Sequence, residues 1–375
     1  MRRLLILCAI ALTFACQPSR ISGKLAPGAW DQTVRKALDD VISSNRDKDA
    51  YAVFDFDKTT IVHDISQALW VYQIEHLCYA DAPSHSFLDG IPDTSKEIDG
   101  ISFAEFGAIL KEDFEQLSAI LSQGKSLEEI HSSDIYLDFR TRMAVMLTRM
   151  DGIFGSEVSY LWMPGLLAGY THEQAREVVH DAVLEHLGKD KLAVEDWNSP
   201  DGKWSIKVER GIYFPPEMKD LYNCRRKNGI TPYVCSASME LIVEVLACDP
   251  ELGLGLPPEQ VFGLRMMPGE IISASYDSQY VQPIKDGKAS CINKYIAPCH
   301  SGAQPILVAG DSNGDVPMLS SYPNMQHGLI IDVGRDPESK IGKLAAQARA
   351  ERNLGRYLLQ PAFAKASGEI SGGGI

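Results

Sequence analysis

The 375-residue sequence has little cysteine, few long hydrophobic runs and a shortage of positive charge, and each of these absences excludes a class of protein. Its eight cysteines include no Cys-x-x-Cys pair and no Cys/His spacing typical of zinc sites, so neither a disulfide-dense scaffold nor a zinc module is expected. Beyond the N-terminus, no apolar run reaches the roughly 18 residues of a transmembrane helix. The chain is long enough for two domains.

Acidic residues outnumber basic ones by 50 to 36, which gives a net charge of −14 at pH 7. No run of Lys or Arg forms a basic patch, so nucleic acid is not an expected partner. An acidic protein repels anionic ligands at long range. A site for an anion must therefore supply its positive potential locally.

The N-terminus predicts export. Arg2 and Arg3 precede the apolar or small residues 4–14, a run too short to span a bilayer, so residues 1–15 are interpreted as a signal peptide. Cys16 directly follows the small residue Ala15, which resembles a bacterial lipoprotein processing site with Cys16 as the lipidated residue. Thr13 fits that pattern poorly, so ordinary cleavage before Cys16 stays open. The expected location is outside the cytosol, on a membrane through this lipid anchor. Residues 16–28 are expected to be a flexible tether, and residues 361–375 a flexible tail.

Residues 51–54 form a short run of aromatic, small and β-branched residues, which predicts a buried strand. Asp55, Asp57 and Thr59 follow it directly, at the kind of strand end where open α/β sheets bind ligands. The chain turns off the strand here, so the two carboxylates diverge and can take different chemical tasks. Taken alone, Asp-x-Asp at a strand end is more often turn chemistry or helix capping.

A second apolar strand, residues 231–238, ends in hydroxyl side chains. Ser236 is suited to contact a phosphate oxygen there, whereas Ser238 could be a plain helix N-cap. Further along, Lys288 opens a helical stretch. A lysine in the first turn opposes the helix dipole, so Lys288 has no local structural reason to be there.

A third strand, residues 305–310, is followed by Asp311 and Asp315. Carboxylates gathered at the carboxyl edge of a sheet offer hard oxygen ligands, which favour Mg²⁺ over soft metals. Helix capping by Asp311 or Ser312 is the alternative.

Asp-x-Asp-x-Thr, strand-Ser, Lys and Gly-Asp-x-x-x-Asp, in this order, resemble the motif series of the haloacid dehalogenase superfamily. Asp57 places the resemblance on the phosphatase side, because the dehalogenases lack an acid there. Residues 211–245 are similar to the phosphoserine phosphatase and phosphorylcholine phosphatase branch. The resemblance implies an α/β fold with a doubly wound parallel sheet, formed by residues 29–63 and 211–360. A mostly helical cap domain, residues 64–210, is inserted between them.

The resemblance also implies a Mg²⁺-dependent phosphomonoesterase that forms an aspartyl-phosphate. Asp55 is similar to the nucleophile of this family, and Asp57 to its general acid and base. The implied metal ligands are Asp55, Asp57 through its backbone carbonyl, and Asp311. Asp315 is implied to orient Lys288 or a metal-bound water. The implied phosphate contacts are Ser236, Lys288 and Thr59.

The inserted segment has helical apolar spacing at residues 64–77, 103–121, 135–147 and 172–187, with a loop at 80–100. A last helix is predicted at residues 341–359. A cap of this size would close over the site and exclude water and bulky ligands, so the expected substrate is a small phosphomonoester.

Aromatic side chains in the cap bear on the substrate. Trp70 and Tyr72 are candidates for a cage that would hold a quaternary ammonium group by cation–π attraction, as in phosphocholine. Core packing is the commoner role of such residues.

The remaining cysteines and histidines carry weaker signals. Cys235 is expected to be a buried thiol, and Cys291 and Cys299 are a plausible disulfide pair. His172, His180 and His186 share a predicted helix at spacings of eight and six residues, which do not stack on one face. They are expected at the surface and not as metal ligands.

Two alternatives to a hydrolase remain. A phosphotransferase of the same fold would pass the phosphoryl group to an alcohol instead of water. A surface lipoprotein could keep the fold as a binding module, although the intact set of acidic and basic motif residues argues against a degenerate site.

Overall fold

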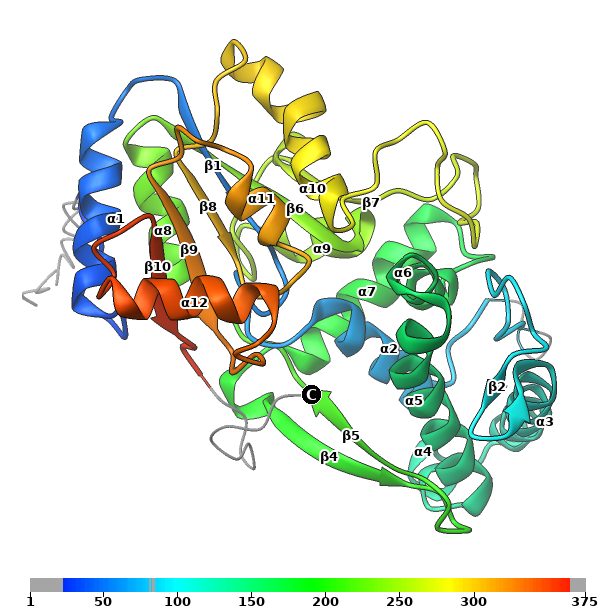
Figure 1. The fold of residues 1–375 in the computed structure, drawn as a ribbon. Helices are drawn as coiled ribbons and strands as arrows, with labels where there is room; N and C mark the ends of the chain where they lie inside the picture. The colour runs from blue at the N-terminus through cyan, green and yellow to red at the C-terminus, as the bar shows by residue number, and fades with distance from the viewer. Residues whose placement is uncertain (1–22, 81, 83–84, 365–375) are drawn as a thin grey trace, which may run out of the picture.

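The computed structural model describes residues 23–80, 82 and 85–364, which form a sheet-containing core and a mainly helical cap (Figure 1). The predicted signal peptide, the lipidation candidate Cys16 and residues 365–375 of the predicted tail lie outside these residues. Within the described part of the chain, no helix is both long enough and apolar enough to cross a membrane.

The core contains a six-stranded sheet in the order β10-β9-β8-β1-β6-β7, in which every neighbouring pair is parallel. Its strands are β1 (Ala50–Phe54), β6 (Ile230–Met239), β7 (Val261–Leu264), β8 (Leu307–Gly310), β9 (His327–Asp332) and β10 (Tyr357–Pro361). The chain runs from β1 outward to β6 and β7, then returns to β8 on the other side of β1. This reversal makes the gap between the carboxyl ends of β1 and β8 the expected ligand site.

Helices cover both faces of the sheet, which explains why the central strands are hydrophobic throughout. Ala52 and Phe54 of β1 pack on one face, and Tyr51 and Val53 pack on the other. The first face is covered by α1 (Gln32–Ser44), α8 (Pro216–Lys227) and α9 (Glu240–Ala247). The second is covered by α10 (Asp286–Cys291), α11 (Val316–Ser320) and α12 (Lys340–Ala350). The predicted doubly wound parallel sheet is confirmed.

The inserted segment, between β1 and β6, is mostly helical as predicted. Its helices are α2 (Ile65–His76), α3 (Phe103–Ser122), α4 (Leu127–His131), α5 (Asp134–Phe154), α6 (Ser156–Gly165) and α7 (His172–His186). The Asp64 side chain caps α2, and a Thr171–Gln174 capping box opens α7. The segment also holds two short antiparallel pairs, β2 (Glu97–Ile98) with β3 (Ile101–Ser102) and β4 (Ala193–Asn198) with β5 (Ser205–Arg210).

Helix α2 lies between the two bodies. Ile65 and Leu69 belong to the hydrophobic cluster of the core, whereas Trp70 and Ile74 belong to that of the cap. Helix α7 also packs on the core cluster, through Val179 and its neighbours. The cap is therefore joined to the core over two helix faces and not by linkers alone.

Two predictions about elements are wrong. The helix predicted at residues 341–359 ends at Ala350, and the chain then forms β10. Arg352 and Asn353 adopt left-handed backbone conformations, which end the helix. The hairpin of β4 and β5 was missed, although its turn contains the Pro200-Asp201-Gly202 signal.

Parts of the predicted tether and tail are ordered against the core. The side chain of Leu25 is buried, and its N–H donates to Asp39 at 2.8 Å. At the other end, Phe363 packs edge-on against Trp30. Leu25 and Phe363 therefore contact the core from within the segments predicted to be a flexible tether and tail.

The predictions for thiols and imidazoles had mixed outcomes. Cys235 is fully buried, as expected. All cysteines in the described residues are free, so the proposed Cys291–Cys299 pair is wrong; Cys291 points into the core cluster, while Cys299 is exposed. His172 and His180 are exposed as predicted, but His186 is buried, which contradicts the surface prediction.

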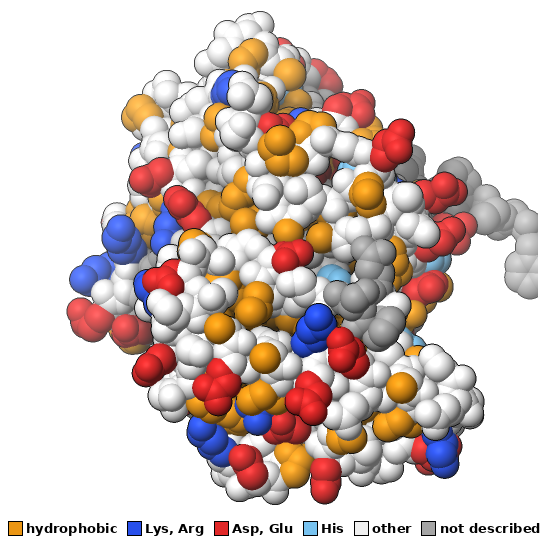
Figure 2. Space-filling view, turned by 90° about the vertical axis from the view of Figure 1, so that its right-hand side faces the viewer, with side chains coloured by type: hydrophobic (Ala, Val, Ile, Leu, Met, Phe, Trp, Pro, Cys, Tyr) orange, Lys and Arg blue, Asp and Glu red, His pale blue; other side chains and the backbone are white. Residues whose placement is uncertain are grey.

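Acidic and basic side chains intermingle with hydrophobic ones on the face of the molecule shown in Figure 2. In this view no extended area carries one sign of charge. Any attraction of this face for an anion must therefore come from a local site and not from a charged surface.

Candidate active site

The predicted motif residues meet at the carboxyl edge of the three central strands. Asp55 follows β1, Ser236 lies in β6 and Asp311 follows β8. Because β8, β1 and β6 are neighbours, their ends bring these side chains to the switch point of the sheet. The backbone N–H of Asp55 donates to the carbonyl of Ala309 at 3.0 Å, which fixes the first residue of the turn against β8.

The turn after β1, residues 55–63, is held in a tight shape by its own hydrogen bonds. The hydroxyl of Thr60 donates to the carbonyl of Asp55 at 2.6 Å, and the N–H groups of Thr60 and Ile61 donate to the carbonyl of Phe56. Lys58 and His63 have positive φ values of 57° and 61°. Residues other than glycine rarely adopt this backbone conformation, so the surrounding structure must enforce it.

Lys288 links two carboxylates in the centre of the site. Its ammonium lies 2.6 Å from Asp55 Oδ1 and 2.5 Å from Asp315 Oδ1, and the side chain is only 3% exposed. A buried lysine needs such partners, because a lone buried charge is costly. The predicted association of Lys288 with Asp55 is therefore present in the structure.

Asp315 shapes the loop after β8. Its Oδ2 accepts hydrogen bonds from the N–H groups of Asp311 and Ser312, at 3.0 and 2.9 Å, and from the Ser312 hydroxyl at 2.9 Å. Its other oxygen pairs with Lys288. Of the two predicted partners of Asp315, Lys288 is the one that its side chain contacts.

Asp57 faces a different set of partners from Asp55. Its Oδ1 accepts from the N–H of Ile65 at 2.8 Å, and its Oδ2 accepts from the Ser238 hydroxyl at 2.7 Å and the Ser236 hydroxyl at 3.4 Å. The two motif carboxylates therefore diverge, as expected. Ser238 is not the N-cap of α9, because that position is Met239 with no side-chain cap.

Three side chains at the site were not predicted from the sequence. Ser238 holds Asp57, Arg335 lies 2.5 Å from Asp311 Oδ2, and Lys58 pairs with Glu209 at 2.8 Å. Arg335 follows the Gly334 turn after β9, so its sequence context carries no motif. The predicted Thr59 hydroxyl lies 3.3 Å from Asp55 Oδ2 and 3.4 Å from Asp311 Oδ1, between the two acids.

The carboxylates fit a hard divalent cation. Asp55, Asp311 and Asp315 are all buried, and each has an oxygen within 4.8 Å of the others. Burial, followed by the charge of Asp315, raises the pKa of Asp55 to about 8. Burial also raises the pKa of Asp311, against the effect of Arg335. An oxygen-only set with this excess of negative charge is the donor set that Mg²⁺ prefers. The Asp57 side chain lies outside this group, so only its backbone carbonyl remains as the predicted ligand.

The proposed aromatic cage of Trp70 and Tyr72 does not form. Trp70 is 1% exposed and stacks on Trp197 inside the cap, with ring centroids 5.6 Å apart. Tyr72 lies on the opposite side of α2, against the core cluster. Residues two apart on a helix do not face each other, so these rings cannot enclose one ligand.

Tyr160 of α6 is a solvent-exposed aromatic residue of the cap. Its side chain is 39% exposed, and burial raises the pKa of its phenol, with Lys288, Asp64 and Asp55 all within electrostatic reach. The hydroxyl of Tyr276, on a loop of the core, donates to the carbonyl of Glu157 at 3.0 Å and so holds α6 against the core. Sequence patterns alone could not distinguish Tyr160 from the buried aromatic residues around it.

Comparisons with known proteins agree with this geometry. The haloacid dehalogenase-like hydrolase family matches residues 161–320. The phosphorylcholine phosphatase of Pseudomonas aeruginosa is 24% identical over 337 residues, which are 82% of this chain and 80% of that protein. The solved structure of a conserved protein of unknown function from Anaerococcus prevotii DSM 20548 is 27% identical with a TM-score of 0.79, and covers 93% of this chain and 100% of its own. Residues 161–320 thus match a haloacid dehalogenase-like hydrolase domain, and this match together with the phosphorylcholine phosphatase relative supports a phosphatase.

Proposed function

We propose that the protein is a Mg²⁺-dependent phosphomonoesterase that acts through an aspartyl-phosphate on Asp55. The observation that carries this proposal is the buried Lys288, which joins Asp55 and Asp315 beside Asp311. Phosphoryl transfer depends mainly on positioning and on charge stabilisation, and this group of side chains supplies both.

In the first step an oxygen of Asp55 attacks phosphorus, and the bond from phosphorus to the ester oxygen breaks. Asp57 gives its proton to the departing alkoxide. Burial and the nearby Asp64 raise the pKa of Asp57 well above its ordinary value, which favours the protonated form that a general acid needs. The Ile65 N–H and the Ser238 hydroxyl hold the Asp57 carboxyl in place for this task.

In the second step Asp57, now ionised, takes a proton from water, and the water oxygen attacks phosphorus and releases Asp55. Lys288 places a fixed positive charge next to the nucleophile. Ser236 and Thr59 lie where they can donate to phosphoryl oxygens, after giving up their present carboxylate partners. Bound Mg²⁺ would offset the repulsion between an anionic nucleophile and an anionic phosphate.

For the substrate, we propose a small ester whose alcohol carries a cationic amine, such as phosphocholine or phosphoethanolamine. The half-exposed ring of Tyr160 offers a cation–π surface close to Asp55. The likeness to a phosphorylcholine phosphatase favours the same class. Phosphoserine, which also carries an amine, is the nearest competitor to test.

We also propose that the protein is exported and attached to a membrane through a lipid on Cys16. The support is the sequence of residues 1–16 alone. Metabolic labelling with a fatty-acid analogue should mark the wild type but not Cys16→Ala. Labelling of both, or of neither, would remove the anchor from the proposal.

The test of the activity is phosphate release from a panel of phosphocholine, phosphoethanolamine, phosphoserine, p-nitrophenyl phosphate and nucleotides, with Mg²⁺ and with EDTA. We expect release that needs Mg²⁺ and that Asp55→Asn abolishes, with the amine-bearing esters preferred. Full activity of Asp55→Asn would refute the covalent route. Release that needs an added alcohol acceptor would show a phosphotransferase instead.

A further inference from the structure

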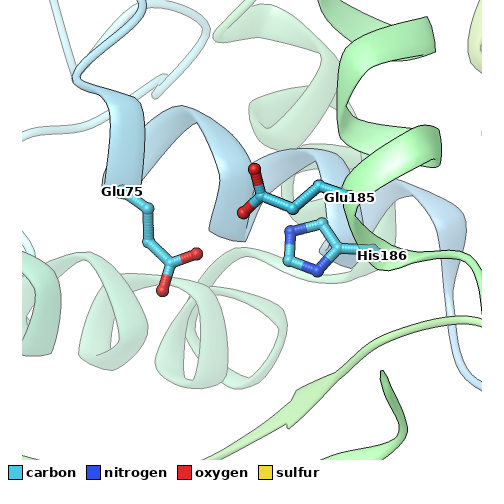
Figure 3. Close-up of side chains that lie close together, drawn as sticks. All are labelled: Glu75, Glu185 and His186. Carbon is cyan, nitrogen blue, oxygen red and sulfur yellow. The ribbon is translucent and has the colours of Figure 1, made fainter. Parts of the chain in front are cut away.

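A second group of metal-type side chains, separate from the carboxylates of the active site, lies where the ends of α2 and α7 meet beside Arg210, a place we call the hinge. Glu75, at the end of α2, and Glu185 and His186, at the end of α7, each offer a ligand atom within 4.8 Å of the others. Figure 3 shows the three side chains converging from the two helices. Glu75 is about one hundred residues away from Glu185 and His186 in the sequence, so no local spacing predicts that they form a cluster.

The decisive feature of this cluster is the imidazole of His186. The residue is 3% exposed, and its Nε2 has no hydrogen-bond partner within the described part of the chain. Figure 3 shows an edge of the ring turned toward the two carboxylates. A buried polar atom without a partner is costly, and native structures rarely keep one without a role such as ion binding.

The groups around the cluster are compatible with a bound cation. Arg210 pairs with one oxygen of Glu75 at 2.6 Å and with Glu195 at 3.2 Å, which leaves the other Glu75 oxygen for a ligand bond. Ligating carboxylates are commonly anchored by such outer hydrogen bonds. His76 Nε2 lies 2.9 Å from Glu185 Oε2 and so anchors this carboxylate from outside the cluster.

The charge of the Glu75, Glu185 and His186 cluster and its access to solvent are also compatible with a bound cation. The carboxylates of Glu75, Glu185 and Glu195 outnumber the one guanidinium, that of Arg210, so the cluster has an excess of negative charge. Burial, followed by the Arg210 guanidinium, lowers the pKa of His186 to about 4. The Glu185 side chain is exposed, so an ion can enter from its side.

We propose that Glu75, Glu185 and His186 bind a divalent transition-metal ion, with Zn²⁺ the best match. A mixed set of imidazole nitrogen and carboxylate oxygen suits Zn²⁺ and its neighbours, whereas Mg²⁺ and Ca²⁺ prefer oxygen alone. The two sites would thus select different metals through their ligand atoms, with Mg²⁺ at Asp55 and Asp311 and the second ion at the hinge.

Such an ion would fasten the cap to the core. It would join the end of α2 to the end of α7, beside Arg210 at the point where β5 returns to the core. The expected role is therefore to hold the hinge, and not to take part in catalysis.

The test uses the full chain, stripped with EDTA and returned to saturating MgCl₂, which is then titrated with ZnCl₂ by calorimetry. Glu185→Gln removes one exposed ligand without disturbing the interior. Glu177→Gln is the matched control, because it makes the same change at an exposed position on the same helix. We expect the wild type and Glu177→Gln to bind one Zn²⁺ with equal affinity. In Glu185→Gln the affinity for that ion should fall by about tenfold or more.

Glu75→Gln and His186→Gln should give the same loss, and Zn²⁺ should raise the melting temperature of the wild type and of Glu177→Gln only. Mg²⁺-dependent phosphatase activity should survive in Glu185→Gln, so a failure of this proposal is distinct from a failure of the proposed function. Equal Zn²⁺ binding in wild type and Glu185→Gln, or no binding in either, would overturn the site. An anomalous diffraction signal from zinc away from Glu75 would overturn it as well.

Discussion

Replacement of Ser238 by alanine tests whether Asp57 is the general acid. The hydroxyl donates to Asp57 Oδ2 at 2.7 Å, in a nearly buried position. A hydrogen bond to a neutral carboxyl group, the form in which Asp57 acts as the acid, is worth about 0.5–1.5 kcal/mol, which corresponds to roughly 2- to 13-fold in rate. The Ile65 N–H still holds the other oxygen, so we expect a loss within this range, at most roughly tenfold.

The assay compares kcat/KM for an alkyl ester, phosphocholine, with that for p-nitrophenyl phosphate. This ratio covers the reaction only as far as phosphoryl transfer to Asp55, so the later attack of water does not enter. An alkoxide needs the proton from Asp57 to leave, whereas p-nitrophenolate leaves without it. Ser238→Ala should therefore lose up to roughly tenfold on phosphocholine and little on the aryl ester.

Ser122→Ala is the control, because Ser122 is an exposed serine at the end of α3 in the cap. It should leave both substrates unchanged. Equal losses on the two esters in Ser238→Ala would show a general disturbance of the site. No loss on either would show that the Ser238 hydroxyl does not position the acid.

Three further outcomes follow from the same geometry. Tyr160→Ala should raise KM for phosphocholine by about 2- to 30-fold, from a cation–π energy of about 0.5–2 kcal/mol, and leave KM for p-nitrophenyl phosphate unchanged. The control Trp70→Phe should leave both KM values unchanged. A rise in KM for phosphocholine in Trp70→Phe instead would support the rejected cage of Trp70 and Tyr72. Lys288→Met should lower the denaturant midpoint in urea, because breaking a buried ion pair costs about 3–5 kcal/mol, and an unchanged midpoint would show that Asp55 and Asp315 do not depend on Lys288. In EDTA the melting temperature should fall as the pH rises from 5 to 8: the folded-state pKa of Asp55 is raised to about 8, so the folded protein binds the proton that the unfolded chain has already lost. Mg²⁺ should raise the melting temperature more at pH 8 than at pH 5, and a flat profile in EDTA would contradict the pKa shift.

The sequence was sufficient for the parts of the fold that depend on local pattern. Asp55, Asp311 and Lys288 could be placed because each stands at the end of an apolar strand or the start of a helix, and strand ends converge in a parallel sheet. Helix α3 was predicted almost to the residue, since its apolar spacing and its Ser102 cap are both local signals.

Apart from the β4–β5 hairpin, whose turn signal is local, the features that were missed depend on tertiary contacts. Strand β10 carries a sequence that also fits a helix, and only pairing with β9 decides between them. The hinge cluster was missed because Glu75 and His186 meet through the packing of α2 on α7, whereas spacing rules test one helix at a time. Arg335 reaches Asp311 from a turn without any pattern of its own.

Helix α2 limits how the cap can move. At its start the Ile65 N–H holds Asp57, and at its end Glu75 enters the hinge cluster. One face of α2 packs on the core through Ile65 and Leu69, and the other packs on the cap through Ile74. If the whole cap swung open with α2, the Asp57 hydrogen bond and the core packing of Ile65 would both be lost. Opening by a slide between α2 and the rest of the cap would keep Asp57 in place. An ion at the hinge would fix α2 to α7, which itself packs on the core, so it would oppose the swing that carries α2 away from the core.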